Sequence, residues 1–379
     1  MKLAGLKVLD LSSFLPGPHM SMMMADHGAD VIMIEVANGR GEPARDIGYR
    51  ADDGVSVWFR NIGRGKEAVA LNLKEAGDLA YFRSLAREAD VVVEAFRPGV
   101  VERLGIGPAA LRAENPGLVY CSISAFGQDG PLRDRPAHDL AVQALAGTTD
   151  LNRGLEDDKP AMPNIPAADM CASLMAFSGI LMALYRRRST GQGDVLDISM
   201  HDCLLSWTAN VTGPVFAEDR APEPKTMRSF GGAGMYNIYE TSDGKFIVLG
   251  GSEPKFARVL LDALERPDLY SYATIEPGPE QAPLRAFFKN SFAAKPLDHW
   301  MAFLGNLDIC WAPVLTLKEA FEHPHVKVRS MLLHDSDKQT HLGVPIKFAG
   351  EPAMPNLSLP PYREAASGHR PRFSGGNEQ

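Results

Sequence analysis

Residues 7–35, KVLDLSSFLPGPHMSMMMADHGADVIMIE, contain the two strands and the helix that decide the fold. The segment Lys7–Leu11 predicts a strand, and the turn Pro16-Gly17-Pro18 comes shortly after it. A methionine-rich helix is predicted from His19, and Val31–Glu35 predicts a second strand. A strand, a helix and a strand in so short a stretch are typical of a parallel βαβ unit.

The same alternation recurs through the first third of the chain. Strands are predicted at Val69–Leu73, Val91–Phe96 and Gly117–Ser124, and a helix is predicted at Glu75–Glu88. These patterns predict an α/β domain built on a parallel sheet. Such sheets bind ligands beyond the carboxyl ends of their strands. The loops expected to contact a ligand are therefore Ser12–Pro18, Phe96–Gly99 and Ser124–Gly130.

A second, smaller region is predicted after a proline-containing boundary at Gly213–Thr226. Its clearest signal is a hairpin, in which Met235–Glu240 and Lys245–Gly250 flank the turn residues 241–244, TSDG. Helical patterns follow at Lys255–Glu265, Pro283–Phe292 and Leu297–Leu304.

Two further helices are predicted between these regions, one near Asp139–Gly147 and one from Ala167. The second contains Cys171–Tyr185, the most apolar run of the chain. This run is shorter than the roughly 18–20 residues that span a bilayer. We interpret it as a buried core helix, and no membrane partner is expected.

The composition excludes several classes of protein. The chain has 379 residues, with 39 Lys and Arg against 47 Asp and Glu, which gives a formal charge of −8. A chain with this balance has no global attraction to nucleic acid, so no nucleic-acid partner is expected. The four cysteines show no metal-ligand spacing, so no metal site is expected, and their apolar surroundings favour a reducing cytoplasm.

Several known motifs can be tested against the sequence. Residues 63–68, GRGKEA, have the glycine spacing of a dinucleotide-binding loop, but they precede a strand and do not follow one, which argues against a nicotinamide site. The sequence contains no P-loop, no Gly-x-Ser-x-Gly elbow and no His-Glu-x-x-His pair. The remaining candidates are His138-Asp139, Asp169, the loop Phe230–Gly234 and Glu253-Pro254.

Each of these candidates also has a purely structural interpretation. Asp169 lies where a first helical turn favours a carboxylate, because the helix dipole and the free backbone N–H groups stabilise negative charge there. The dipeptide His138-Asp139 is typical of a helix cap, and the glycine cluster is typical of a turn. The residues alone leave both interpretations open.

Six segments, in order along the chain, resemble the class III (CaiB/BaiF-type) CoA-transferase superfamily. They are Leu15–Pro18 with Ala25–Glu35, Asn61–Lys66 with Leu71–Lys74, Phe96–Gly105, Phe126–Pro131, Thr190–Met200, and His323–Val326 with Arg329. Each segment is a weak signal. Their ordered spacing over nearly the whole chain identifies the protein as a member of this superfamily.

The resemblance implies a large Rossmann-like domain, a smaller α/β domain and an interlocked homodimer. We expect the large CoA-binding domain at residues 1–200, a linker at 201–226, the small domain at 227–325, and a return to the large domain at 326–379. The implied partners are an acyl-CoA and a carboxylic acid. Coenzyme A would be part of the substrate, and no permanently bound cofactor is expected.

The resemblance also assigns the coenzyme contacts. By position, Leu71, Phe96 and Arg103 match family contacts with CoA, and Arg97 lies in the same motif. A guanidinium pairs well with the phosphates, and apolar side chains suit the adenine and pantetheine. The chain departs from the family pattern at Ala95, where Asn is common, and after the second strand, where a basic residue is common.

Asp169 aligns with the catalytic aspartate of the family. In the transferases this carboxylate attacks the acyl-CoA carbonyl and forms an acyl-aspartyl anhydride. We expect the helix N-terminus to keep Asp169 ionised and its N–H groups to stabilise the oxyanion. The resemblance gives Gly231, Gly232 and Gly234 the role of a loop that covers this intermediate and excludes water.

The superfamily also contains α-methylacyl-CoA racemases, which remove and return the proton next to the thioester. That chemistry needs two acid/base groups on opposite faces of the carbon atom. The roles implied by resemblance are His138 and Asp169 as the two bases and Glu253 as the partner that orients the imidazole. Transfer and racemisation both remain open from the sequence.

Overall fold

The computed structural model describes residues 1–154 and 158–374, and the chain forms two compact units. The first unit contains Met1–Thr148, Pro163–Thr208 and Pro324–Gln379. The second contains Thr149–Met162 and Ala209–His323. Each unit has its own hydrophobic core. The domain boundaries expected from the sequence stay predictions.

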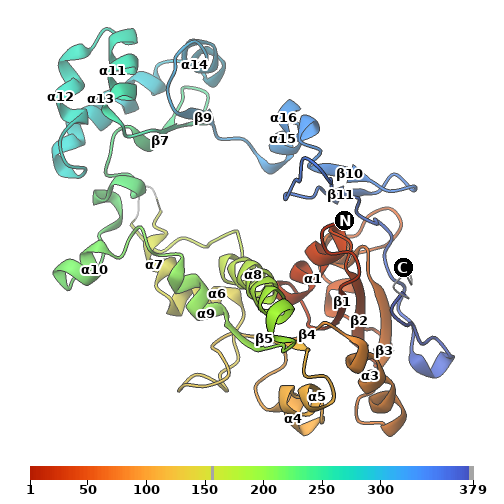
Figure 1. The fold of residues 1–379 in the computed structure, drawn as a ribbon. Coiled ribbons are helices and arrows are strands. Elements are labelled where there is room, and N and C mark those ends of the chain that lie inside the picture. The colour runs from red at the N-terminus through yellow and green to blue at the C-terminus, as the bar shows by residue number, and fades with distance from the viewer. Residues whose placement is uncertain (155–157, 375–379) are drawn as a thin grey trace. The chain divides into compact units, whose positions relative to one another are not determined.

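The first unit is built on a six-stranded sheet whose strands all pair in parallel (Figure 1). The strand order is β3-β2-β1-β4-β5-β6, the order of a doubly wound Rossmann sheet. The strands are β1 Lys7–Leu11, β2 Asp30–Val36, β3 Glu67–Leu71, β4 Val91–Glu94, β5 Val119–Ser124 and β6 Val195–Ser199. The predicted parallel sheet is confirmed, and β6 is an additional strand.

Helices cover both faces of this sheet. Alternate residues of a strand point to opposite faces, so Val8 belongs to the core under α1 and α8, and Leu9 belongs to the core under α3 and α5. The helices of the first unit are α1 Pro16–Asp26, α2 Val57–Gly63, α3 Ala76–Glu88, α4 Val100–Arg103, α5 Pro108–Glu114, α6 Asp139–Leu145, α8 Ala167–Thr190, α9 Met200–Ser206 and α16 Pro324–Val328. The short α7, Thr148–Leu151, lies where the units meet in sequence.

Helix α8 differs from the expected core helix. It is 24 residues long, and by length and composition alone it could cross a membrane, but only 39% of its most apolar window is buried. One side packs against α1, β5 and β6. The other side exposes Leu174, Met175, Met182 and Tyr185. The predicted core helix is therefore confirmed in part, because Cys171, Ala172 and Ala176 belong to the core and the exposed side chains do not.

Two buried ion pairs give residues 63–66, GRGK, a structural role. Arg64 donates to both carboxylate oxygens of Asp26, at 2.9 and 2.7 Å, and a further N–H bonds the carbonyl oxygen of Leu342. Lys66 Nζ lies 3.2 Å from Asp10 Oδ2 and donates to the carbonyl oxygen of Pro18 at 2.9 Å. These cations are almost completely buried, so the segment braces the first βαβ unit.

The C-terminal residues pack on the first unit. The hairpin of β10 Leu332–His334 and β11 Thr340–Leu342 contacts α2. Further along, Glu364 forms a bridge with Ala70 of β3, and Arg45 donates to the carbonyl oxygen of Pro360 at 3.0 Å. The last third of the chain therefore contributes to a sheet that begins at residue 7.

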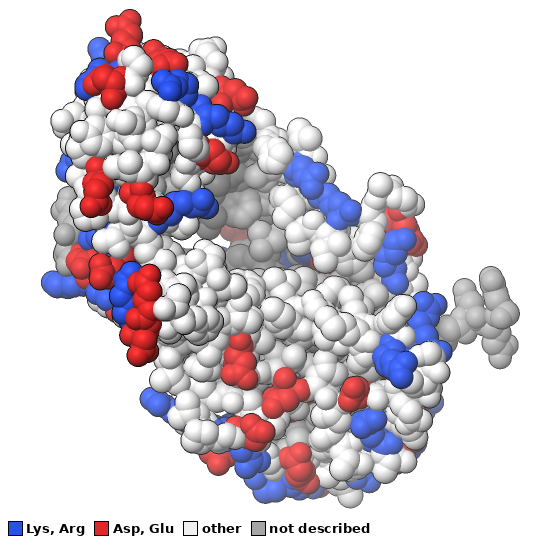
Figure 2. Space-filling view, turned by 60° about the vertical axis from the view of Figure 1, so that its left-hand side comes forward, with Lys and Arg blue, Asp and Glu red and all other residues white. Residues whose placement is uncertain are grey.

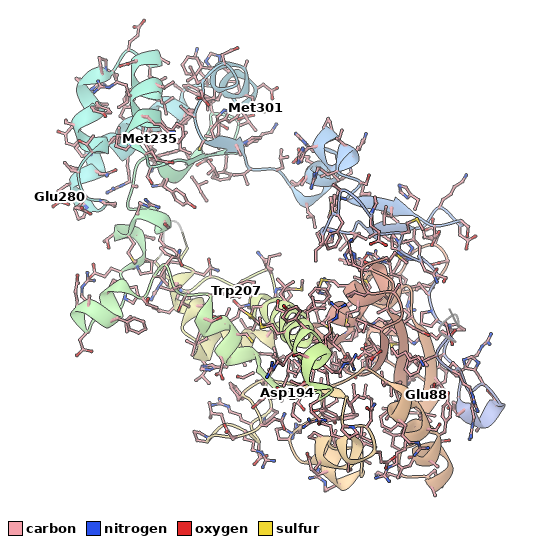
Figure 3. All side chains as sticks on the ribbon, in the orientation of Figure 1. Glu88, Asp194, Trp207, Met235, Glu280 and Met301 are labelled. Atoms are coloured by element: carbon pink, nitrogen blue, oxygen red, sulfur yellow. The ribbon has the colours of Figure 1, made fainter. Side chains whose placement is uncertain are left out.

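The second unit has a three-stranded antiparallel sheet packed against helices. The strands, in the order β7-β8-β9, are β7 Tyr236–Glu240, β8 Phe246–Gly250 and β9 Trp311–Pro313. The predicted hairpin is confirmed by the pairing of Glu240 with Phe246. Met235, labelled in Figure 3, belongs to the core of this unit. The helices are α10 Gly213–Glu218, α11 Pro254–Ala263, α12 Tyr270–Ala273, α13 Ala282–Ala293, α14 Leu297–Leu304 and α15 Leu317–Glu322.

Candidate active site

Asp169 lies in the first turn of α8, as the sequence predicts. Pro166, at the N-cap of this helix, offers no side-chain acceptor to the first N–H groups. Asp139, in the first turn of α6, supplies it. Its Oδ1 accepts hydrogen bonds from the backbone N–H of Ala168 at 2.8 Å and of Asp169 at 3.2 Å. A carboxylate from another helix therefore caps α8 at the position of Asp169.

Asp139 is itself held in place. Its Oδ2 accepts a hydrogen bond from Gln143 Nε2 at 2.6 Å, and the same nitrogen lies 3.2 Å from the carbonyl oxygen of Ile165. Gln143 follows Asp139 by one helical turn, so both side chains lie on the face of α6 that meets α8. The sequence indicates Asp139 only as the neighbour of His138.

The environment of Asp169 favours its protonated form. Burial, with the negative charge of Asp139 as the second cause, raises the pKa of the Asp169 carboxyl to about 7. With this pKa the carboxyl is only partly ionised near neutral pH, and the expectation that the helix terminus keeps Asp169 ionised stays a prediction. The N–H groups of Ala168 and Asp169 are occupied by Asp139 and cannot also bind a substrate oxyanion.

His138 is the N-cap residue of α6 and is exposed. Its ring meets the edge of the Phe14 ring, with centroids 5.5 Å apart and planes at 81°. Phe14 adopts a φ of 68°, an uncommon value for a bulky residue, and its N–H donates to Glu42 Oε1 at 2.8 Å. The structure thus brings His138, Asp139 and Asp169 together through α6, with the Ser12–Pro18 loop beside His138.

His19 of α1 forms a further contact with α8. Its Nδ1 lies 2.8 Å from Ser173 Oγ, and Ser173 follows Asp169 by one helical turn. Burial, and secondly the charge of Lys66, lowers the pKa of His19 to about 4. His19 is therefore a neutral imidazole at physiological pH, and the sequence indicates it only as the start of a predicted helix.

The predicted coenzyme contacts lie at the ends of two strands, β3 and β4, which are separated in the sheet by β2 and β1. Leu71 ends β3 and is buried, and the N–H of Phe96 donates to Glu94 Oε2 at the end of β4, at 2.7 Å. Arg97 and Arg103 are both exposed, and within residues 1–154 and 158–374 neither has an ion-pair partner. Two unpaired guanidinium groups therefore lie near the carboxyl end of β4.

Glu94 is a further ionisable group that the sequence did not indicate. Burial raises its pKa to about 7, although the N–H of Phe96 and the hydroxyl of Ser122 favour its ionised form. Through the Phe96 N–H, the carboxyl of Glu94 fixes the start of the loop that carries Arg97.

The glycine loop and Glu253 belong to the second unit. The loop is pinned by side chains: Asn237 donates to the carbonyl oxygen of Gly231 at 2.9 Å, and Gln281 accepts from the N–H of Gly234 at 3.0 Å. Gly231 has a φ of 95°, and a Cβ atom at Gly232 would lie 2.3 Å from the carbonyl oxygen of Thr226. The backbone therefore requires glycine at these positions, and the loop is fixed on its own unit.

Glu253 is exposed at the N-cap of α11 and forms no side-chain capping bond. It belongs to a different unit from His138, so the proposed orienting contact between them stays a prediction.

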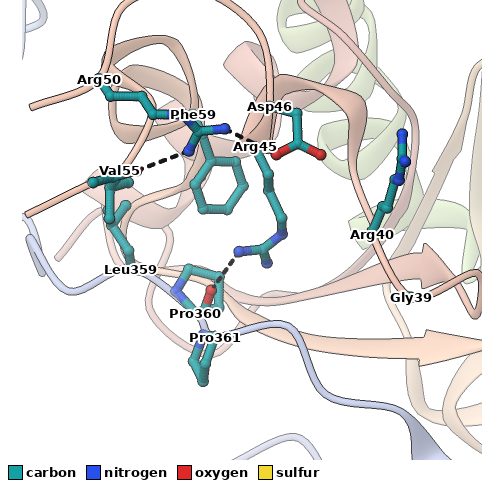
Figure 4. A pocket seen from close by; sticks show the side chains of 11 residues that line it. Gly39, Arg40, Arg45, Asp46, Arg50, Val55, Phe59, Leu359, Pro360 and Pro361 are labelled. Atoms are coloured by element: carbon teal, nitrogen blue, oxygen red, sulfur yellow. Dashed lines mark hydrogen bonds and ion pairs between the residues drawn. The ribbon is translucent and has the colours of Figure 1, made fainter.

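A hollow of about 560 Å³ lies beside the loop after β2, between Arg40 and the C-terminal segment Leu359–Pro361 (Figure 4). Most of its positive charge is already paired. Arg45 binds both oxygens of Glu35, and Arg50 binds Asp46 at 3.0 Å. Arg40 alone among the lining arginines has no such partner in the described residues. The hollow is therefore only weakly suited to an anion.

The surface charges agree with the acidic composition. On the face shown in Figure 2, basic and acidic side chains are interspersed. Among the residues that the structure describes, no group of three His, Cys, Asp or Glu side chains could hold a metal ion.

Comparison with known proteins identifies the family. The model of the CoA-transferase family III matches residues 3–365. The chain is 33% identical over 359 residues to an acetyl-CoA:oxalate CoA-transferase of Acetobacter aceti, covering 91% of this chain and 89% of that protein. It is 31% identical over 370 residues to the α-methylacyl-CoA racemase of Homo sapiens, covering 96% and 90%.

A solved structure supports the same assignment. The crystal structure of a CaiB/BaiF family protein from Brucella suis matches with a TM-score of 0.82 at 27% identity, covering 95% of this chain and 96% of that one. The parallel central sheet and the order of elements are shared over nearly the whole length. The chain belongs to the CoA-transferase family III.

Proposed function

We propose that this protein transfers coenzyme A from an acyl-CoA donor to a carboxylic acid acceptor, with Asp169 as the nucleophile. The observation that carries the proposal is the setting of Asp169, a buried carboxyl at the start of α8 whose backbone is fixed by Asp139. A desolvated carboxylate with a raised pKa is a stronger nucleophile than one in water. The transferase from Acetobacter aceti supports this choice of reaction.

The reaction needs no redox step. Asp169 Oδ attacks the thioester carbon, the C–S bond breaks, and CoA leaves as a thiolate while an acyl-aspartyl anhydride forms. The thiolate attacks the aspartyl carbonyl, which releases the donor acid. The acceptor carboxylate then displaces CoA to form a second anhydride, and the thiolate attacks the acceptor carbonyl. This last step gives the new acyl-CoA and regenerates the Asp169 carboxylate.

The other predicted residues have supporting roles. Arg97 and Arg103 would bind the phosphates of CoA, because both guanidinium groups are exposed and unpaired within the described residues. Leu71 and Phe96 would contact the adenine and pantetheine. Gly231, Gly232 and Gly234 would cover the anhydride and exclude water, as a fixed edge of the second unit rather than a flexible flap.

The test is to trap the anhydride. Hydroxylamine added during turnover should convert the side chain of Asp169 to a hydroxamate, detectable by peptide mass spectrometry. Asp169→Asn should lower kcat at least about 10³-fold, because the nucleophile is lost. The matched control is Asp134→Asn, since Asp134 is highly exposed. Full activity of Asp169→Asn, or no hydroxamate during rapid turnover, would overturn the mechanism.

Racemisation of a 2-methylacyl-CoA is the second candidate, because a carboxyl with a pKa near 7 is well suited to proton transfer. His138 would be the opposite base and Glu253 its partner. The human racemase supports this alternative. Incubation with a (2R)-2-methylacyl-CoA in deuterated water, without an acceptor acid, separates the two. Deuterium at the α-carbon indicates racemisation, whereas no exchange together with CoA transfer to an added acid indicates the transferase.

We also propose that the protein acts as an interlocked homodimer in the cytoplasm. The exposed apolar residues on α8 support association, since Met182 and Tyr185 are 69% and 78% exposed in the single chain. The four free cysteines fit a reducing compartment. Light scattering on the purified protein should give twice the mass of the 41.2 kDa chain, and a monomer at micromolar concentration would contradict the dimer.

A further inference from the structure

The second unit contains a cationic cavity beside the glycine loop. The cavity has a volume of about 370 Å³. Its wall includes three basic side chains, two amides and one glycine of the loop, namely Arg153, Lys225, Arg285, Asn152, Asn237 and Gly231. No Asp or Glu lines it among the residues that the structure describes. This composition suits a negatively charged ligand.

Arg285 is the most informative residue of the wall. Its Nη1 donates to the carbonyl oxygens of Gly232 at 2.5 Å and Gly278 at 2.6 Å. Both acceptors are neutral, and Arg285 has no carboxylate partner within residues 1–154 and 158–374. A guanidinium has five N–H groups, so the three on Nε and Nη2 remain for a ligand. The carbonyl contacts hold this charge in place without neutralising it.

The other two cations, Arg153 and Lys225, come from other segments of the second unit. Their partners, Asp150 and Asp158, do not line the cavity. Arg153 donates to the carbonyl oxygens of Asp150 at 2.6 Å and Asp158 at 2.8 Å and also pairs with the Asp150 carboxylate. Lys225 Nζ lies 3.5 Å from Asp158 Oδ1. These contacts position the two charges, and the cavity wall keeps a surplus of positive charge through Arg285.

We infer that this cavity is a binding site for a small organic anion that carries carboxylate groups. The choice of a carboxylate among possible oxyanions rests on the proposed function, because a CoA transferase takes a carboxylic acid as its acceptor. The volume lies within the range of small-molecule sites and admits a dicarboxylate.

Occupancy of the cavity acts directly on the glycine loop. Gly231 is part of the wall, Asn237 holds the Gly231 carbonyl oxygen, and Arg285 holds the Gly232 carbonyl oxygen. A ligand that bonds Arg285 and Asn237 therefore tightens two of the contacts that fix the loop. The site couples the concentration of a free acid to the stability of the loop proposed to cover the intermediate.

The first experiment measures binding by calorimetry on the full-length protein without acyl-CoA. Succinate should bind, and succinamide, its neutral counterpart, should not. Inorganic phosphate and free CoA distinguish the other sources of an oxyanion. Phosphate or CoA that displaces succinate and binds more tightly overturns the carboxylate assignment, and so does the absence of succinate binding.

Variants then locate the bound anion. Lys225→Gln should weaken succinate binding at least about fivefold, and Arg285→Lys should do the same because it removes the guanidinium fork. Lys245→Gln is the matched control, since Lys245 is a partly exposed lysine of the same unit outside the cavity. Arg285→Lys could loosen the loop, so its thermal midpoint is measured alongside, whereas the ion pair of Lys225 is with Asp158, which is outside the glycine loop. Equal affinity in Lys225→Gln and the control would refute the site.

A final experiment distinguishes a failure of this binding site from a failure of the proposed function. Asp169→Asn should lose turnover but bind succinate with unchanged affinity, because Asp169 belongs to the other unit. Hydrogen exchange at residues 231–237 should slow when succinate is added to either protein. Binding without any CoA transfer would leave the cavity assigned and overturn only the transferase. Loss of binding in Asp169→Asn would place the anion at Asp169 and overturn the cavity.

Discussion

The first unit buries carboxylates in two different ways. Asp10 and Asp26 lie within the first βαβ unit, and each contacts a buried cation, Lys66 and Arg64. Asp169 is also largely buried, but the charged group that acts on it is another acid, Asp139. A paired buried charge holds a fold together, whereas an unpaired one is costly to the fold and useful for chemistry. The contrast separates the structural carboxylates from the candidate catalytic one.

The largest effect should come from breaking a structural pair. Arg64→Met leaves the Asp26 charge buried without its cation, which we expect to destabilise the first unit by about 3–5 kcal/mol. The change is measured as the shift of the urea midpoint. Arg87→Met is the control, because Arg87 is half-exposed and its pair with Glu114 should contribute less than about 1 kcal/mol. Equal losses in the two variants would remove the distinction between buried and exposed pairs.

The pH profile of the wild type tests the unpaired carboxylate. With a pKa of about 7 for Asp169, the ionised fraction rises about a hundredfold between pH 5 and pH 8. We therefore expect kcat to rise with pH through 7 if the carboxylate is the attacking form. A kcat that is already constant at pH 5 would show that Asp169 is ionised there, and the comparison with Asp10 and Asp26 would fail.

Asp139→Asn sharpens the comparison by removing only the neighbouring charge. An asparagine oxygen can still accept from the N–H groups of Ala168 and Asp169, so the cap should persist. We expect the rising limb of the kcat profile to move to lower pH by about half a unit to one unit. Rate against pH for this variant and for Asp134→Asn gives the answer. A profile that does not move would assign the raised pKa to burial alone.

The smallest effect concerns stability. A carboxyl whose folded pKa is raised binds more protons when folded, so its contribution to stability is present at low pH and is lost as pH rises from about 4 through 7. The Asp169→Asn variant has no titrating carboxyl at this position, so it does not lose this stability as pH rises. Its thermal midpoint should exceed that of the wild type by about 2–4 °C at pH 8 and match it near pH 4. A lower midpoint at pH 8 would indicate that Asp169 stabilises the fold.

The sequence predicts the sheet better than the site. Strands such as β4, which begins with the continuous apolar run Val91–Val93, are buried because both faces of the parallel sheet are covered, and that pattern can be recognised directly in the sequence. Strand β6, Val195–Ser199, lies at the edge of the sheet and is half exposed, so its pattern was missed. The hairpin at 236–250 follows from its turn residues.

The ionisation state of Asp169 could not be predicted for a physical reason. The sequence shows the helix terminus, whose dipole favours the charged form, but it does not show burial or the approach of Asp139 across about 30 residues. In the same way, residues 61–66 resemble a family motif without revealing that Arg64 and Lys66 are buried ion-pair partners. Local patterns can be recognised in the sequence, but desolvation by segments that are distant in the sequence cannot.

The hydrogen bond from Arg64 to Leu342 forms only after most of the chain has been synthesised. The guanidinium group is completed by the carbonyl oxygen of Leu342, which the ribosome adds 278 residues after Arg64. All of the second unit is synthesised between the two. Until the hairpin at 332–342 has been synthesised, this N–H group of Arg64 therefore lacks its carbonyl acceptor. Synthesis of the first unit therefore starts before that of the second unit and ends after it.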